Sequence, residues 1–195
     1  MKGYPTYPSS RAYFRQVAAL LEDLDAQCDR FVETLYRGFD EQRTIFLCGN
    51  GGSAANASHF GQDLAKGTLS SMAAVRRFRV IPLTDNIGFI TALANDEGYD
   101  SIFEQQLRNL AGAGDLLVAI SGSGNSPNVL RAVEYANAIG MKTIGVTGYD
   151  GGKLRALAHE SVHIPIEDMG MCEAIHGVVF HAAMCFLRER LTELS

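Results

Sequence analysis

The feature that most constrains the fold of this chain is an alternation, from residue 43 onward, of short apolar runs with helical patterns. Each apolar run is too short for a buried helix and is followed by turn residues, so each is predicted to be a strand. Strands that are apolar almost throughout and separated by helices indicate a parallel sheet covered on both faces. The predicted strands are residues 44–49, 78–84, 115–121, 142–148 and 161–166.

The patterns between these strands predict the covering helices. The expected fold is therefore α/β, a three-layer αβα sandwich around a five-stranded parallel sheet with right-handed connections. Because no linker, low-complexity segment or internal repeat divides the chain, residues 1–195 are predicted to form a single domain. The predicted helices follow residue 53 and cover residues 87–93, 101–110, 126–139, 153–158 and about 172–192.

A regular apolar stripe precedes the alternating part of the chain. Apolar residues recur at spacings of three and four from Phe14 to Leu35, which predicts one long helix within residues 9–39, with Gly38 as a candidate for its end. This helix either faces the core of its own chain or also packs against copies of itself. The regularity of the stripe favours the second interpretation, an oligomerisation segment.

Composition narrows the class of protein. With a formal net charge of -5, the chain lacks the basic excess of a general nucleic-acid binder, and Arg76, Arg77 and Arg79 are interpreted as a solvated surface. The N-terminal residues have no signal-peptide core, and no apolar run approaches the ~18 residues of a membrane span. The four cysteines form no CxxC pair, so buried reduced thiols are expected. We therefore expect a cytoplasmic protein with no nucleic-acid or membrane partner.

Two turns rich in glycine and serine follow predicted strands. The first is "GNGGS" at residues 49–53, and the second is "SGSGNS" at residues 121–126. Both are expected to face one pocket, because ligands of open parallel sheets bind at the carboxyl ends of the strands. Serine hydroxyls, exposed amides and the start of a helix suit an anion, and the absence of Lys and Arg favours a phosphate monoester on a small polyol over a polyphosphate. Simple capping and chain reversal is the alternative interpretation.

Ionisable side chains follow the first turn and recur near the C-terminus. His59 and Asp63 are four residues apart in a helical pattern, so they share a helix face and can approach one metal or one substrate. The last predicted helix carries Glu173 and His181, and their separation of eight residues corresponds to about 12 Å. They reach one site only if Glu173 lies at the helix start or if the two come from different subunits. His176 is interpreted as a core residue.

Four stretches of the chain resemble the sugar isomerase (SIS) domain family, and within it the D-sedoheptulose 7-phosphate isomerases, or phosphoheptose isomerases. They are "GNGGSAANASHF", "ANDEGYDSIFEQQL", "ISGSGNSPNVLRAVEYANAIGMKTIGVTG" and "GGKLRALA", and the resemblance extends over nearly the whole chain. It implies a flavodoxin-like sheet and an aldose-ketose isomerase that converts D-sedoheptulose 7-phosphate to D-glycero-D-manno-heptose 7-phosphate in heptose biosynthesis. It also implies a homotetramer with active sites between subunits.

The resemblance implies a substrate site assembled from both turns. The serine turn would hold phosphate, while the first turn and an asparagine-aspartate pair would contact the sugar. The residues expected to bind the substrate are Asn50, Gly51, Gly52, Ser53, Asp63, Asn95, Asp96, Ser121, Gly122, Ser123, Ser126 and Glu173.

The resemblance also implies the catalytic groups. Isomerisation through an enediolate needs a base, an acid and a means of stabilising negative charge. The implied base is Asp63, the implied acid is His181, and one zinc ion per subunit would be held by His59, Asp63, Glu173 and His181. The family has Glu in place of Asp63 and Gln in place of Glu173. Asp63 has about 1.5 Å less reach than Glu, whereas Glu173 adds an anionic oxygen ligand that favours a metal.

Two other functions stay open on the sequence. A chain of this fold can lack catalysis and bind a protein partner, as the replication-initiation regulators that resemble these isomerases do, although such a chain has no need of His181 on an apolar helix. An isomerase of another sugar phosphate would use the same fold and the same phosphate turn.

Overall fold

One parallel sheet of five strands, in the order β2-β1-β3-β4-β5, forms the centre of the computed structural model, which describes residues 5–193. This is the strand order of flavodoxin-like folds, in which the direction of winding reverses between β1 and β3. All five predicted strands are confirmed, although β2 and β5 are shorter than expected. The strands are β1 (Thr44–Gly49), β2 (Arg79–Pro82), β3 (Leu116–Ser121), β4 (Lys142–Thr147) and β5 (Glu160–His163).

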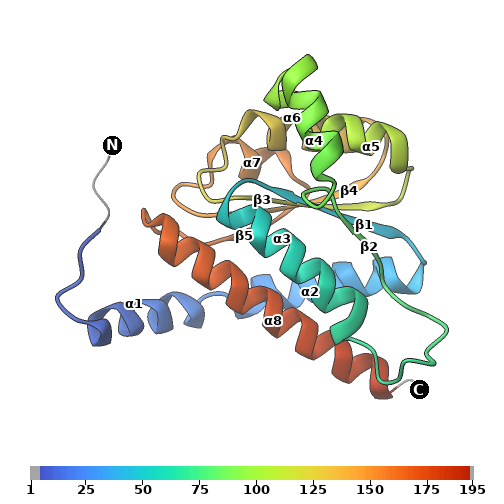
Figure 1. Ribbon diagram of the computed structural model, residues 1–195. Coiled ribbons are helices and arrows are strands. Elements are labelled where there is room, and N and C mark those ends of the chain that lie inside the picture. The colour runs from blue at the N-terminus through green and yellow to red at the C-terminus, as the bar shows by residue number, and fades with distance from the viewer. Residues whose placement is uncertain (1–4, 194–195) are drawn as a thin grey trace.

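Helices cover both faces of the sheet, which confirms the three-layer α/β sandwich (Figure 1). The helices α2, α3 and α8 lie on one face, and α4 to α7 lie on the other. The bounds are α1 (Ser10–Glu22), α2 (Asp25–Asp40), α3 (Gly52–Gln62), α4 (Ile87–Asp96), α5 (Glu104–Leu110), α6 (Pro127–Ala138), α7 (Gly152–Leu157) and α8 (Met169–Glu193), with a π-helical turn η1 (Asp63–Gly67) and a 3-10 turn η2 (Tyr99–Ser101).

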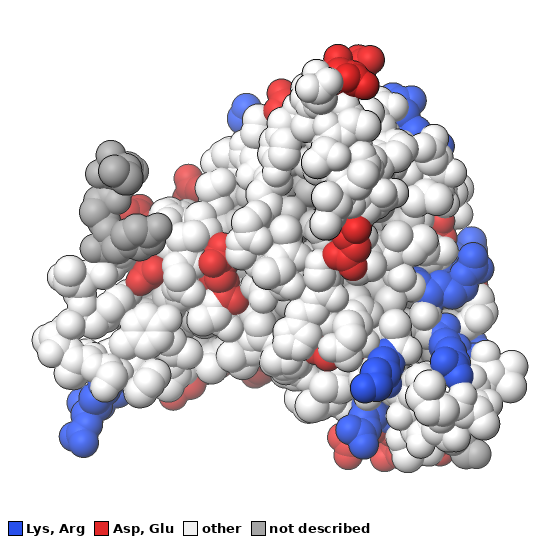
Figure 2. Space-filling view, in the orientation of Figure 1, with Lys and Arg blue, Asp and Glu red and all other residues white. Residues whose placement is uncertain are grey.

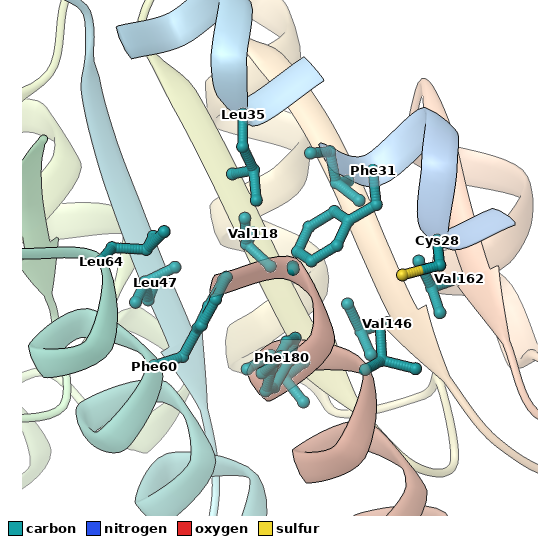
Figure 3. Close-up of a cluster of buried hydrophobic side chains, with 14 of the residues drawn as sticks. Cys28, Phe31, Leu35, Leu47, Phe60, Leu64, Val118, Val146, Val162 and Phe180 are labelled. Carbon is teal, nitrogen blue, oxygen red and sulfur yellow. The ribbon is translucent and has the colours of Figure 1, made fainter. Parts of the chain in front are cut away.

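The hydrophobic core on the α2, α3 and α8 face fixes these helices against the sheet. Figure 3 shows Phe31 of α2, Phe60 of α3 and Phe180 of α8 converging above Leu47 and Val118 of the central strands. The rings of Phe60 and Phe180 stack with their centroids 4.5 Å apart. Because aromatic side chains contribute large buried areas, this contact holds α3 and α8 side by side. It thereby sets the relative positions of the polar residues that these two helices also carry.

The predicted N-terminal helix is in fact two helices, α1 and α2, and the expectation of one continuous helix is wrong. The second half of the apolar stripe, from Leu24 to Leu35, is buried in the chain's own core, whereas Phe14 of α1 is 67% exposed. The core-facing interpretation therefore holds for α2. Gly38 does not end the helix: it lies within α2 with the side chain of Leu116 packed close to it.

The last helix, α8, departs from the expectation that no segment approaches the length of a membrane span. By length and composition alone α8 could cross a bilayer, with a hydropathy of 1.4 in its most apolar window. However, 44% of that window is buried inside the protein. Ile175, Val179 and Ala183 of α8 pack in the hydrophobic core. Core packing thus accounts for the apolar character of α8, and the helix indicates a membrane protein only weakly.

Two expectations about individual side chains are confirmed only in part. Three of the cysteines are buried free thiols, but Cys185 is exposed. Arg76 is not simply solvated: it donates to the carbonyl of Asp40, at 2.8 Å, and its guanidinium lies 4.9 Å from the ring of Phe39. Because the last carbonyls of a helix have no intrahelical donor, Arg76 stabilises the C-terminal end of α2.

Candidate active site

A pocket of about 240 Å³ lies at the carboxyl ends of β1 and β3, where the strand order reverses. The turn after β1 enters α3 through Gly51, whose φ of 57° suits glycine, and the turn after β3 enters α6 through Ser126 and Pro127. This is where ligands bind in flavodoxin-like folds. We call it the sheet-edge pocket; it is lined by Asn50, Gly51, Gly52, Ser53, Ile120, Ser121, Gly122, Ser123, Ser126, Met169 and Glu173.

The serine turn presents hydroxyl groups and main-chain amides to this pocket. The hydroxyls of Ser121 and Ser126 are 3.2 Å apart, and the hydroxyl of Ser123 accepts a hydrogen bond from the amide of Asn125 at 3.3 Å. Gly124, with φ of 64°, allows the reversal of the chain. No Lys or Arg of residues 5–193 lines the pocket. An anion in it would therefore be held by neutral donors and by the start of α6.

The start of α8 closes one side of the sheet-edge pocket. Built at Gly52, a Cβ atom would collide with the carboxyl group of Glu173, and built at Gly122 it would collide with the sulfur of Met169. The side chains of α8 thus approach both turns closely. Met169 was not predicted as a pocket residue. Its only signal in the sequence is its place at the start of a helix that carries other candidate residues.

Glu173 is the carboxylate among the lining residues of this pocket. Burial raises the pKa of its side chain above the usual value. Its main-chain carbonyl accepts a hydrogen bond from Asn56 of α3 at 3.0 Å, which ties this turn of α8 to α3. The placement agrees with the expected contact to a sugar, but Glu173 does not join the histidines described next.

Three expected site residues form a second group, which we call the His–Asp cluster. His59 of α3, Asp63 of η1 and His181 of α8 place their ligand atoms within 4.8 Å of one another. The Asp63 carboxylate lies 3.8 Å from Nε2 of His59 and 3.4 Å from Nε2 of His181. Asp63 is buried, whereas the side chains of the two histidines are 55% and 53% exposed. The cluster is thus open to solvent on its histidine side.

The residues of the His–Asp cluster fit a metal ion. Oδ2 of Asp63 is buried and has no hydrogen-bond partner in the described part of the chain; His181 is near enough for an ion pair but is not oriented to donate. A buried carboxylate oxygen without a partner is costly, and a bound cation would satisfy it. Two imidazoles and one carboxylate are also the three-ligand set of many catalytic zinc sites. This donor set accepts several first-row metals, so it does not identify one.

The remaining expected site residues lie apart from the His–Asp cluster. Glu173 is not among the ligand atoms that converge there, so three of the four expected metal ligands meet within one chain. Asn95 and Asp96, at the end of α4, are exposed and joined by a hydrogen bond of 2.7 Å, and neither lines the sheet-edge pocket. As expected, His176 is fully buried in the core.

The fold and the pocket define an α/β protein of flavodoxin-like topology with a pocket between two glycine- and serine-rich turns at its switch point. Residues 12–148 match the SIS domain, and the chain belongs to this family. A phosphoheptose isomerase of Aliarcobacter butzleri is 40% identical over 169 residues, which cover 87% of this chain and 85% of that protein. A phosphoheptose isomerase of Desulfovibrio desulfuricans is 42% identical over 137 residues, which cover 70% and 64%.

Solved structures agree with these sequence relatives. The structure of a phosphoheptose isomerase from Neisseria gonorrhoeae matches with a TM-score of 0.83 and 31% identity, covering 92% of this chain and 96% of that one. The structure of a phosphoheptose isomerase from Francisella tularensis matches with a TM-score of 0.84 and 26% identity, covering 92% of this chain and 96% of that one. The resemblance to the sugar isomerase family is therefore confirmed.

Proposed function

We propose that this chain is an aldose-ketose isomerase that converts D-sedoheptulose 7-phosphate to D-glycero-D-manno-heptose 7-phosphate. The observation that carries the proposal is the sheet-edge pocket: two turns of neutral donors meet at the switch point of a chain that is 40% identical to a phosphoheptose isomerase over 87% of its length. A phosphate monoester suits this pocket better than a polyphosphate, because no Lys or Arg among its described lining residues would balance further charge.

In the proposed reaction, the serine turn binds the phosphate and the glycine turn contacts the sugar hydroxyls. A base then removes a proton from the carbon beside the carbonyl and returns it to the former carbonyl carbon, while an acid moves protons between the two oxygens as the enediolate forms and collapses. Asp63 and His181 are the proposed base and acid, and Nε2 of His59 lies 3.8 Å from the Asp63 carboxylate. A metal held by His59, Asp63 and His181 would stabilise negative charge on the sugar oxygens; zinc is the proposed ion.

The proposal includes a homotetramer with active sites between subunits. Along α8, Glu173 in the sheet-edge pocket and His181 in the His–Asp cluster are about 12 Å apart. In the proposed assembly, a second copy supplies the other half of each site. Support comes from the surface: Phe14, Val178 and Phe186 are exposed, and the face over α3, α8 and α4 is mostly uncharged (Figure 2). A cytoplasmic location suits a phosphorylated substrate and buried free thiols.

The direct test is to incubate the purified protein with a panel of ketose phosphates and follow aldose formation. We expect turnover of sedoheptulose 7-phosphate in excess of fructose 6-phosphate and ribulose 5-phosphate, loss of turnover on chelation, and recovery with zinc. Absence of turnover for the whole panel, with and without zinc, would contradict an enzyme and favour a partner-binding protein. Preference for a shorter sugar would contradict the heptose assignment alone.

A further inference from the structure

Two asparagine side chains connect the two ligand turns through a closed pair of hydrogen bonds. Nδ2 of Asn50 donates to Oδ1 of Asn128 at 2.9 Å, and Nδ2 of Asn128 donates to Oδ1 of Asn50 at 2.9 Å. Asn50 belongs to the turn after β1, and Asn128 belongs to the first turn of α6, directly after the serine turn. Asn128 is 1% exposed, so its amide group is shielded from water, whereas Asn50 also lines the sheet-edge pocket.

A tyrosine from a third segment completes the arrangement. The hydroxyl of Tyr99, in η2, donates to Oδ1 of Asn50 at 2.9 Å, although the rest of the side chain is exposed. The amide oxygen of Asn50 therefore accepts two hydrogen bonds. Because a carbonyl oxygen has two lone pairs, this oxygen has no further capacity for a sugar hydroxyl.

The direction of every hydrogen bond in this group follows from one main-chain amide. The amide of Val129 donates to Oδ1 of Asn128 at 3.0 Å, which distinguishes the oxygen of this side chain from its nitrogen. The same oxygen accepts from Asn50, and the nitrogen donates to Asn50. Asn50 must then present its nitrogen to Asn128 and its oxygen to both Asn128 and Tyr99, so the tyrosine hydroxyl must donate. The orientation of the whole group is thus set by the start of the helix that follows the serine turn.

We propose that Tyr99 and Asn128 are positioning residues that act through Asn50 to fix the glycine turn relative to the serine turn, so that sugar and phosphate of one substrate are bound together. The inference rests on the proposed sugar phosphate substrate. Under this proposal Asn50 mainly supports the glycine turn, because both lone pairs of its oxygen and one of its amide hydrogens already take part in hydrogen bonds to Asn128 and Tyr99. The two positioning residues differ in what they connect. Among the described residues, the Tyr99 hydroxyl hydrogen-bonds only to Asn50 of the glycine turn, whereas Asn128 directly follows the serine turn.

This difference predicts two patterns of binding, measured by titration calorimetry with sedoheptulose 7-phosphate and with inorganic phosphate. Tyr99→Phe removes one neutral hydrogen bond and should weaken sedoheptulose 7-phosphate about fivefold, with phosphate affinity unchanged. Asn128→Asp still accepts from Val129 but cannot donate to Asn50, so it should weaken both ligands. Tyr13→Phe is the matched control, because the Tyr13 hydroxyl has no hydrogen bond to the described residues. Thermal unfolding checks that each variant is folded.

A double-mutant cycle separates positioning from direct contact. In an Asn50→Ala background, Tyr99→Phe should have no further effect on affinity for sedoheptulose 7-phosphate, because the oxygen through which Tyr99 acts is gone. An equal fivefold loss in both backgrounds would mean that Tyr99 contacts the sugar itself and would overturn the proposal. So would an Asn128→Asp variant that is folded and binds both ligands normally. Binding without turnover in the wild-type protein would contradict the isomerase assignment alone, whereas no binding of sedoheptulose 7-phosphate would overturn both.

Discussion

The sheet-edge pocket and the His–Asp cluster are built in opposite ways. The pocket consists of two short, contiguous turns whose donors are hydroxyls and main-chain amides, and its shape depends on glycines at positive φ. The cluster consists of three side chains from α3, η1 and α8, separated by up to 122 residues, and it places two imidazoles beside one buried carboxylate. A turn that suits phosphate can form from residues that are adjacent in sequence. A group that suits proton transfer or metal binding forms only when two helices pack so that their side chains meet.

The helix α8 joins the two regions. Glu173 near its start faces the sheet-edge pocket, His176 one turn further is buried in the core, and His181 reaches the His–Asp cluster. The Nε2 atom of His176 lies 3.2 Å from the carbonyl of Thr147 at the end of β4. A change in the packing of α8 would therefore move both regions at once, while substitutions within one region should leave the other intact.

The largest effect is expected for Asp63→Asn, which removes the anionic member of the His–Asp cluster. Metal content should fall to background, and turnover of sedoheptulose 7-phosphate should fall on the order of a thousandfold, with affinity for inorganic phosphate unchanged. Metal analysis, a turnover assay and calorimetry measure these three properties. Asp40→Asn, at an exposed carboxylate paired with Arg76, is the matched control. Full activity in a metal-free Asp63→Asn protein would show that the cluster is not part of the catalytic site.

A smaller effect is expected for Ser123→Ala in the sheet-edge pocket. Loss of one hydrogen bond to a charged phosphate costs roughly 1.5 to 3 kcal/mol, so binding of both inorganic phosphate and sugar phosphates should weaken about tenfold or more. Metal content should not change, which is the reverse of the Asp63→Asn pattern. Titration calorimetry and metal analysis on the same preparation test this. Unchanged affinity for phosphate would mean that the serine turn only caps the following helix and does not bind phosphate.

The smallest effect concerns His176, between the two regions. Burial lowers the pKa of His176 from 6.5 to about 4. The unfolded chain therefore takes up a proton below pH 6.5 that the folded protein takes up only near pH 4, so stability should fall with decreasing pH in this window. Between pH 7.5 and 5.5 this amounts to about 1.4 kcal/mol.

His176→Gln should remove this part of the pH dependence, as measured by chemical denaturation at both pH values. His163, whose pKa burial also lowers, stays in the variant and keeps its own contribution. His159→Gln is the control for the loss of one imidazole hydrogen bond, because His159 is an exposed residue whose Nδ1 accepts from the amide of Thr143 at 3.1 Å. Equal pH dependence in wild-type protein and His176→Gln would mean that His176 takes up its proton as readily in the folded protein as in the unfolded chain.

The sequence by itself determined the sheet, its covering helices and the two ligand turns. These features depend on short-range properties: apolar runs favour buried strands, and glycine and serine at strand ends favour turns that expose amides. For the same reason the sheet-edge pocket contains the residues that were predicted from the two turns, namely Asn50, Gly51, Gly52, Ser53, Ser121, Gly122, Ser123 and Ser126. Asn128 and Tyr99 gave no such signal, because an amide pair is formed only when distant segments meet.

Only the tertiary structure decided the positions of side chains that depend on packing between distant elements. The apolar stripe from Phe14 to Leu35 looks continuous in sequence, but α2 must lie on the sheet to cover its core, and the chain breaks at Asp23 to allow it. The pairing of α3 with α8 brings His181 to Asp63 and leaves Glu173 at the sheet-edge pocket. Helical spacing gives the face on which a side chain lies, but the partner of that face is set by the long-range burial of apolar surface.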